Sequence, residues 1–267
     1  MVSIAVVWGV LLAIGMGWAL ARGGPTAREQ TTVADALPVV NRAVARIASA
    51  ATADGQAVAA ISGFDRVGEC SVTVVRSGER YQRAVTVVVT PGTEAALIER
   101  VGARLPADYQ VNVTTGTVPR MVADAGLWVR LNGSVTGKGQ VRFVADTGAC
   151  RPLGDLVTAT GKQTPAGDPA GVDAGRREAA MALARLRVSP AQWNTYRVPC
   201  PGGGAISTVE AIGADGVEPG ALDEVLRGLG APVVATPDAY AYINGPQHVA
   251  VHNDAKHIVV TSTNSCP

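Results

Sequence analysis

Apolar residues in the first half of the chain recur with helical and strand periods in a regular order. A helix is predicted over 37–50, where Val and Ile recur at three- and four-residue spacing, and a second helix is predicted after Thr93. Period-two alternation predicts strands over 71–75, 84–89, 109–113, 127–131 and 140–144. Turns are predicted at 77–79 and 132–133. This half is therefore predicted to be an antiparallel sheet with helices packed on it.

The second half repeats this order of elements in a shorter form. Helices are predicted over 173–187 and after 219–220, with a tight turn at 244–245. The predicted strands are 205–211, 239–243, 248–252 and 257–261. The best-matching segments of the two halves are LWVRLNG (127–133) with AYAYING (239–245), and TGAC (147–150) with TNSC (263–266). This order predicts a tandem duplication of one module.

The predicted fold class is α+β, with two duplicated modules that each pack helices on one face of an antiparallel sheet. The segment 160–171 is rich in Gly, Pro and polar residues, which is typical of a linker. The expected parts are a transmembrane anchor or signal segment (1–22), a juxtamembrane tether (23–36), a first module (37–155), a linker (156–171) and a second module (172–267).

The first apolar stretch, Ile4 to Ala21, contains no charged residue. As a helix these 18 residues extend about 27 Å, which is enough to cross a hydrocarbon core and longer than the apolar region of most signal peptides. The stretch also ends in Ala-Leu-Ala, which resembles a signal-peptidase site. We expect a single-pass protein of the cell membrane, attached through residues 4–21. Secretion after cleavage near Ala21 is the alternative.

The four cysteines bear on orientation and on pairing. Arg22 and Arg28 follow the apolar stretch, so the positive-inside rule alone predicts a cytoplasmic C-terminal part. An even number of cysteines without a C-x-x-C spacing favours disulfides, and disulfides persist outside the cytoplasm. We therefore expect the bulk of the chain to be extracytoplasmic. Each predicted module has one cysteine before its first strand and one after its last, which predicts the pairs Cys70–Cys150 and Cys200–Cys266.

Composition narrows the function classes. The chain has 23 Lys plus Arg against 22 Asp plus Glu, so it lacks the basic excess that nucleic-acid binding requires. With 47% apolar and 17% charged residues it is not a disordered chain. Only 4% of the residues are aromatic, which leaves few rings to stack on sugars or bases. No nucleic-acid partner is expected.

The three histidines are the strongest candidates for chemistry. His248, His252 and His257 lie close together in the sequence, and a hairpin there brings imidazoles near Asp254, a ligand set suited to a divalent metal. No H-E-x-x-H pattern accompanies them, so a structural role at the ends of a hairpin is the preferred interpretation. No metal and no cofactor are therefore expected.

Other catalytic signatures are missing from the sequence. The triple glycine 202–204 has no following Lys and precedes a predicted strand, which does not fit a phosphate-binding loop. Neither G-x-S-x-G nor S-x-x-K occurs, so serine-hydrolase chemistry has no local pattern. No catalytic residue is predicted.

The run YRVPCPGGG (196–204), the N-terminal apolar stretch and the Ala-, Gly- and Arg-rich composition resemble uncharacterised membrane-anchored proteins of high-GC actinobacteria. The resemblance implies an envelope location and no particular activity. The preferred function is a non-enzymatic, membrane-tethered extracytoplasmic module that binds a ligand or a protein partner in the envelope. One alternative is a hydrolase or metal-dependent enzyme that uses the His248–His257 hairpin. Another is a small-ligand binder at the cleft between the modules.

Overall fold

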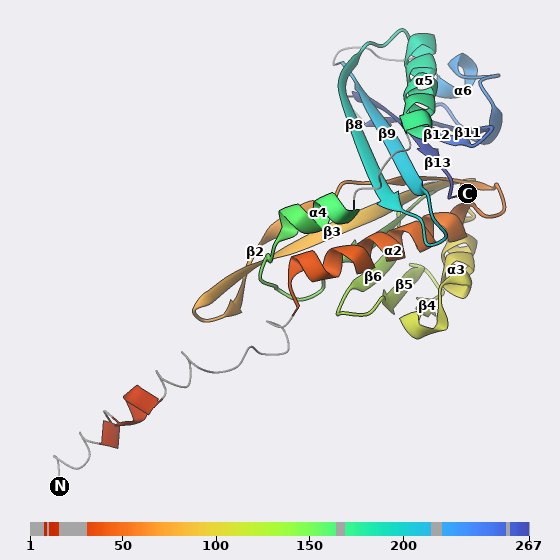
Figure 1. Ribbon diagram of the computed structural model, residues 1–267. Coiled ribbons are helices and arrows are strands. Elements are labelled where there is room, and N and C mark those ends of the chain that lie inside the picture. Colours follow the sequence, from red (N-terminus) through yellow and green to blue (C-terminus); the bar gives the residue numbers. More distant parts are fainter. Residues whose placement is uncertain are drawn as a thin grey trace.

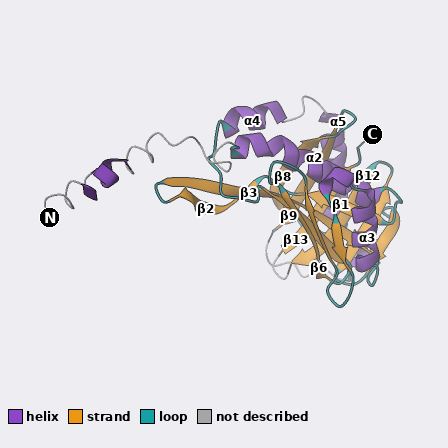
Figure 2. Ribbon diagram, turned by 90° about the horizontal axis from the view of Figure 1, so that it is seen from below, coloured by secondary structure: helices purple, strands orange, loops and turns teal. Residues whose placement is uncertain are grey.

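The computed structural model of the protein describes residues 8–9, 11–15, 31–163, 169–214, 221–254 and 257–266. Within these ranges, no helix is long and apolar enough to cross a membrane. Most of the predicted membrane segment, residues 4–21, lies outside the described residues. The fold of the described chain is α+β with two antiparallel sheets (Figures 1 and 2), as the sequence predicted.

The first sheet has seven strands, with β2 paired to β3 beside the path β1-β3-β7-β6-β5-β4. Its strands are β1 (Ala57–Ile61), β2 (Asp65–Thr73), β3 (Arg76–Val89), β4 (Asn112–Thr114), β5 (Arg120–Asp124), β6 (Arg130–Gly137) and β7 (Gln140–Asp146). The helices of this half are α2 (Val33–Thr52), α3 (Glu94–Arg104) and the 3-10 turn η1 (Ala107–Tyr109).

The second sheet has six strands in the order β10-β11-β12-β13-β9-β8. Its strands are β8 (Pro190–Pro199), β9 (Ala205–Gly213), β10 (Ala231–Ala235), β11 (Ala239–Asn244), β12 (Gln247–Asp254) and β13 (His257–Asn264). The accompanying helices are α4 (Leu156–Gln163), α5 (Pro169–Leu186) and α6 (Leu222–Val225). Helices α5 and α6 lie together on one side of this sheet (Figure 1).

The two sheets share one strand order. When β2 is set aside, each half has a helix, two strands, a second helix and four further strands, and the last strand pairs with the second of the first two. By position, β8 corresponds to β1, β9 to β3, and β10–β13 to β4–β7. Strand β2 is the addition in the first half, because it extends the pairing of β3 beyond the end of β1.

Helix α2 begins four residues earlier than the periodicity predicted. Thr32 and Asp35 form a capping box: the Thr32 hydroxyl accepts from the Asp35 backbone N–H (3.1 Å), and the Asp35 carboxylate accepts from the Thr32 N–H (2.9 Å). These bonds satisfy the exposed donors of the first turn. The hydrogen bonds of Asp35 with Thr32 also lower the pKa of its carboxyl group.

The core beneath α2 extends into the second half of the chain. It combines the α2 stripe with inward-facing residues of the first sheet, and it also contains Val198, Cys200 and Ile206 from β8, β9 and their connection. A separate core lies between α5, α6 and the second sheet, where Leu183, Leu222 and Val260 are fully or almost fully buried. The core beneath α2 therefore contains residues from both halves of the chain, some of them about 150 positions apart in the sequence.

The structure confirms both predicted disulfides. Cys70 is bonded to Cys150 and Cys200 to Cys266, with Cα–Cα distances of 5.8 Å in each case. In each half the bond starts in the segment between two corresponding strands, β1 and β3 in the first half and β8 and β9 in the second, and ends in the residues that follow the last strand. The two disulfides therefore occupy corresponding places in the shared strand order.

Two predicted turns are wrong, and both contain a glycine that serves close packing instead. Gly78 lies inside β3, where a Cβ would come within 2.5 Å of the Arg151 carbonyl oxygen, and the actual turn is at 74–75. Gly133 lies inside β6 against the Phe143 ring, which a Cβ would approach to 2.6 Å. At both sites the missing side chain leaves room for a close neighbour, and the glycine does not reverse the direction of the strand.

Three other expectations differ from the structure. The predicted linker 156–171 contains helix α4 and the first turn of α5. Helix α4 packs along α2 (Figure 2). Strand β8 was not predicted, since its sequence mixes polar and aromatic residues without alternation. The segment LWVRLNG ends in β6, whereas AYAYING forms β11, which corresponds to β5, so that match was wrong by one strand. The match of TGAC with TNSC agrees with the shared order.

Candidate functional site: a cleft between the two sheets

Each sheet has one face covered by helices and a second face turned towards the other sheet. The second faces meet along β1, where Val58, Val234 and Ala250 form a small apolar cluster. Hydrogen bonds between described residues cross from the first sheet to the second. The Ile61 N–H donates to the Thr208 hydroxyl (3.0 Å), the Thr90 hydroxyl to the Val233 carbonyl (3.3 Å), and Arg83 Nη1 to the Arg197 carbonyl (2.9 Å). These contacts hold the two sheets at a fixed angle and leave space beside the junction.

That space is a cleft made of two adjoining hollows, of about 420 and 690 Å³. The hollows share Val88, Gln140, Ala250 and His252, so they form one continuous recess. The smaller hollow is also lined by Val58, Ala60, Ile61, Ser62, Thr86, Thr136, Arg142, Glu210, Val259 and Thr261. Its volume is in the range that holds a small organic ligand. The cleft is therefore the candidate functional site.

Arg142 supplies the cationic group of the smaller hollow, and Lys138 lines the larger one. Arg142 projects from β7 in one cross-strand row with Thr86 of β3 and Ser134 of β6. The guanidinium is partly buried, and no described residue forms a hydrogen bond or an ion pair with it. A half-buried charge without a counter-ion attracts an anionic group, and a guanidinium binds a carboxylate or phosphate through two parallel hydrogen bonds.

Glu210 supplies the acidic group on the opposite wall. Its Oε1 accepts hydrogen bonds from Asn194 Nδ2 (2.8 Å) and from the Tyr196 hydroxyl (3.2 Å). Burial, together with the neighbouring Glu210 carboxylate, raises the pKa of Tyr196 to about 12. The Tyr196 hydroxyl therefore stays protonated at neutral pH and keeps donating to Glu210. The Glu210 carboxylate thus has hydrogen-bond partners within the protein, whereas the positively charged guanidinium of Arg142 has no described partner.

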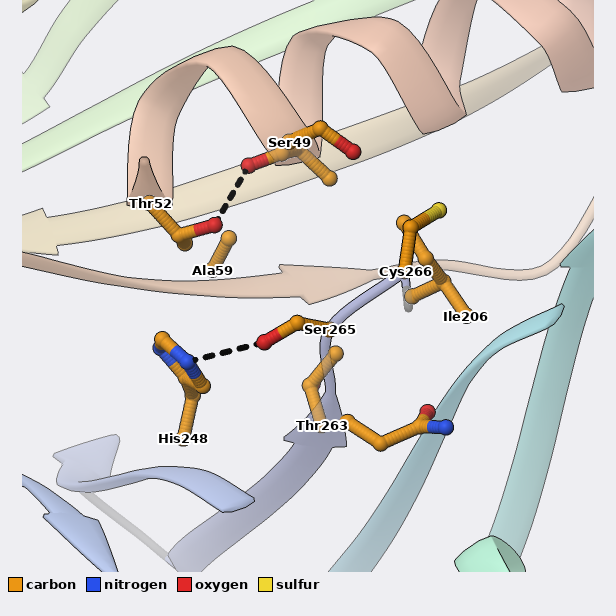
Figure 3. Close-up of a pocket in the computed structure, with 10 residues that line it drawn as sticks. Ser49, Thr52, Ala59, Ile206, His248, Thr263, Ser265 and Cys266 are labelled. Carbon is orange, nitrogen blue, oxygen red and sulfur yellow. Dashed lines mark hydrogen bonds between the residues drawn. The ribbon is translucent and has the colours of Figure 1, made fainter. Parts of the chain in front are cut away.

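His248 does not face the cleft as a potential ligand group, because it is enclosed at the junction. Only 8% of its surface is exposed, and its Nε2 lies 3.1 Å from the Ser265 hydroxyl (Figure 3). The cavity beside it, between α2, β1 and the end of β13, has a volume of about 10 Å³. A space of that size holds about one water molecule and no organic ligand. His248 is therefore a packing residue of the junction.

The other histidine candidates lie on the same face of the β12–β13 hairpin. His252 lines the cleft and is paired with Val259, whereas His257 is paired with Asp254 at the end of the hairpin. The side chain of Asp254 lies outside the described residues. Among the side chains that are described, no group of three or more His, Cys, Asp or Glu residues is arranged to hold a metal ion.

Stability at acidic pH is expected to depend on His248. Burial lowers the pKa of its imidazole below the ordinary value near 6.5, so the unfolded chain binds a proton at a pH where the folded chain does not. The stabilisation is present above about pH 6.5 and is lost as the pH falls through the folded-state pKa. The urea midpoint is therefore expected to fall between pH 7.5 and pH 5 by more in the native chain than in His248→Gln. An equal fall in both proteins contradicts this role of His248.

The cleft residues Arg142 and Glu210 were not singled out from the sequence. Each is one polar residue in an alternating strand, a pattern that ordinarily marks the solvated face of a sheet. Only the packing of the second sheet over the first turns that face into a wall of a cleft. The signal present in the sequence was the predicted pair of modules, which made a ligand site at the inter-module cleft one of the alternatives.

The sequence matches no protein-family model, and neither the curated proteins nor the solved structures include a match to it.

Proposed function

We propose that the protein is a membrane-attached, extracytoplasmic binding protein that holds a small anionic ligand in the cleft between its two sheets. The observation that carries the proposal is the position of Arg142, a partly buried guanidinium without a described partner in a hollow of about 420 Å³. The threonine hydroxyls at 86, 136 and 261 offer further hydrogen bonds to a polar ligand. The role is binding without catalysis.

Two features support the location and origin that the proposal assumes. The uncharged stretch 4–21 provides the membrane attachment, and the two disulfides suit an oxidising compartment outside the cytoplasm. We further infer that the halves arose by duplication of one module, because they share one strand order and corresponding disulfides. On this account the ligand site is a product of the duplication, since its two walls come from different copies.

A thermal-shift panel tests the ligand class. Small carboxylates and phosphate monoesters are added to the native chain, to Arg142→Gln, and to Arg185→Gln as a matched control. Arg185 is an exposed arginine on α5, away from the cleft. A ligand at a hundred times its Kd is expected to raise the Tm of the native chain by about 5–10 °C.

The same shift is expected in Arg185→Gln and is expected to be lost in Arg142→Gln. If no carboxylate or phosphate ester raises the Tm of the native chain, the ligand class is wrong. If the shift survives in Arg142→Gln, the anion is bound elsewhere.

A further inference from the structure

A short loop before β6 displays two large apolar side chains in a strained backbone conformation. Leu127 and Trp128 have φ angles of 48° and 61°, in the left-handed region that bulky residues rarely adopt. Each such residue costs about 1–3 kcal/mol, and strain of this kind gathers at functional positions. The loop nevertheless leaves 46% of Leu127 and 59% of Trp128 exposed to solvent. The fold therefore holds these two side chains outside the core although their backbone conformation is unfavourable.

A buried arginine fixes the loop in this orientation. The Arg151 guanidinium donates to the Leu127 carbonyl, to the Thr147 carbonyl (2.8 Å) and to the Thr31 hydroxyl (2.6 Å). A Cβ at Gly148 would overlap the Trp128 carbonyl, so glycine at this position lets the loop approach β7. One guanidinium therefore places Leu127 beside Thr31, the residue at which the described chain begins after the predicted membrane segment.

Other exposed apolar side chains lie at this same end of the molecule. The β2–β3 turn carries Val74 and Val75, which are 94% and 75% exposed. Figures 1 and 2 show this turn projecting towards the end where α2 begins. Leu153 and Val157, which lead into and begin α4, are 40% and 86% exposed.

Backbone contacts tie both of these segments to the start of α2. Leu153 accepts from the Ala34 N–H (3.2 Å), and Arg151 pairs with Glu79 of the β2–β3 hairpin. The membrane-facing end is defined here as Val74, Val75, Leu127, Trp128, Leu153 and Val157.

We infer that the membrane-facing end docks on the lipid surface to which the chain is attached. The inference rests on the membrane attachment in the proposed function. Only nine residues, 22–30, separate the predicted membrane segment from Thr31, and nine extended residues reach at most about 30 Å. The end that carries the exposed apolar side chains is therefore held close to the bilayer. Tryptophan favours the interfacial zone of a membrane, where its apolar ring and its N–H both find partners.

This docking fixes how the cleft is presented. The second sheet lies away from the start of α2 (Figure 1). The cleft residues Thr86 and Val88 lie near the end of β3 that is remote from the 74–75 turn, so docking of the membrane-facing end leaves the cleft at a distance from the lipid surface. The strain in the loop is then explained, because it places Trp128 on the contact surface rather than in the core.

Depth-dependent fluorescence quenching tests the inference on the full chain. The variant Trp8→Phe, Trp18→Phe, Trp193→Phe leaves Trp128 as the single tryptophan, since the chain has four. It is reconstituted into phosphatidylcholine vesicles with or without lipids brominated near the headgroup end of the acyl chains. Brominated lipid is expected to reduce Trp128 emission at least twofold. A matched variant, Trp8→Phe, Trp18→Phe, Trp128→Phe, keeps only Trp193 on β8 and is expected to show little quenching.

Vesicle flotation distinguishes a failure of the membrane attachment from a failure of the docking. If the chain does not float with vesicles, the membrane attachment and the docking that rests on it are both wrong. If it floats and Trp128 is not quenched, the attachment stands and the docking is overturned. Emission that shifts to the blue with protein concentration, without quenching by brominated lipid, identifies a second copy of the chain as the occupant and also overturns the docking.

Discussion

Removing the Cys200–Cys266 disulfide by substituting both cysteines with alanine is expected to lower the free energy of unfolding by about 5 kcal/mol. The loop closed by this bond spans 66 residues, for which the chain-entropy relation gives about 4.4 kcal/mol. Cys200 is also buried in the core beneath α2, and Cys266 packs against that core. Loss of their sulfur atoms therefore adds a packing penalty to the entropic one.

The Cys70–Cys150 disulfide provides the matched comparison. Its loop of 80 residues is longer, so loop entropy alone predicts a slightly larger loss for this bond, about 4.5 kcal/mol. Neither of its cysteines belongs to the buried cores, because Cys70 lies on the β2–β3 hairpin. Packing therefore reverses the order expected from loop length. Urea unfolding of the two Ala double variants measures both losses, and a larger loss for Cys70–Cys150 contradicts this explanation.

Substituting Arg151 by methionine is expected to cost about 3–5 kcal/mol of unfolding free energy, the second large effect. Arg151 is fully buried, and each hydrogen bond from its charged group contributes about 1.5–3 kcal/mol before relaxation. Its removal leaves the buried carbonyl of Thr147 and the partly buried carbonyl of Leu127 without their donor. Methionine fills much of the same volume, so the loss reports the polar contacts more than a cavity.

Two further variants make this prediction specific. Arg151→Lys keeps the charge, but its donors all lie on one nitrogen, whereas the three nitrogens of the guanidinium each reach a different acceptor. Lysine is therefore expected to restore less than half of the loss. Arg185→Met removes an exposed arginine and is expected to change the unfolding free energy by less than about 0.5 kcal/mol. Equal losses in Arg151→Met and Arg185→Met contradict the account of Arg151.

The parts of the fold that could be predicted are those set by local patterns and by chain order. The α2 stripe and the alternation in β3 and β7 follow from burial on one face. The disulfide pairing followed from the repeated order of elements, and it is confirmed because both halves fold with the same strand order.

The parts that could not be predicted depend on long-range packing. Gly78 and Gly133 were interpreted as turn residues because a glycine between two strands usually marks a turn. Their role is set instead by the neighbours they pack against, which are the Arg151 backbone for Gly78 and the Phe143 ring on the paired strand for Gly133. Likewise Leu127 and Trp128 continue an alternating pattern, but their positive φ angles exclude them from β6, and the Leu127 carbonyl accepts a hydrogen bond from Arg151 instead.

The candidate site illustrates the same limit. The inter-module cleft was one of the alternatives that the sequence left open, but the residues that line it were not identified. Arg142 and Glu210 lie in different sheets, and nothing in their local sequence relates them. The histidines attracted attention because they are close in sequence, yet His248 is enclosed at the junction.

Native mass spectrometry of the protein released from its own membranes is the most direct test of the cleft as a ligand site. The account predicts that the native chain and Arg185→Gln each carry one non-covalently bound small molecule with a carboxylate or phosphate group, and that Arg142→Gln does not. An anionic small molecule retained equally by Arg142→Gln, or a native chain that carries none, would contradict it.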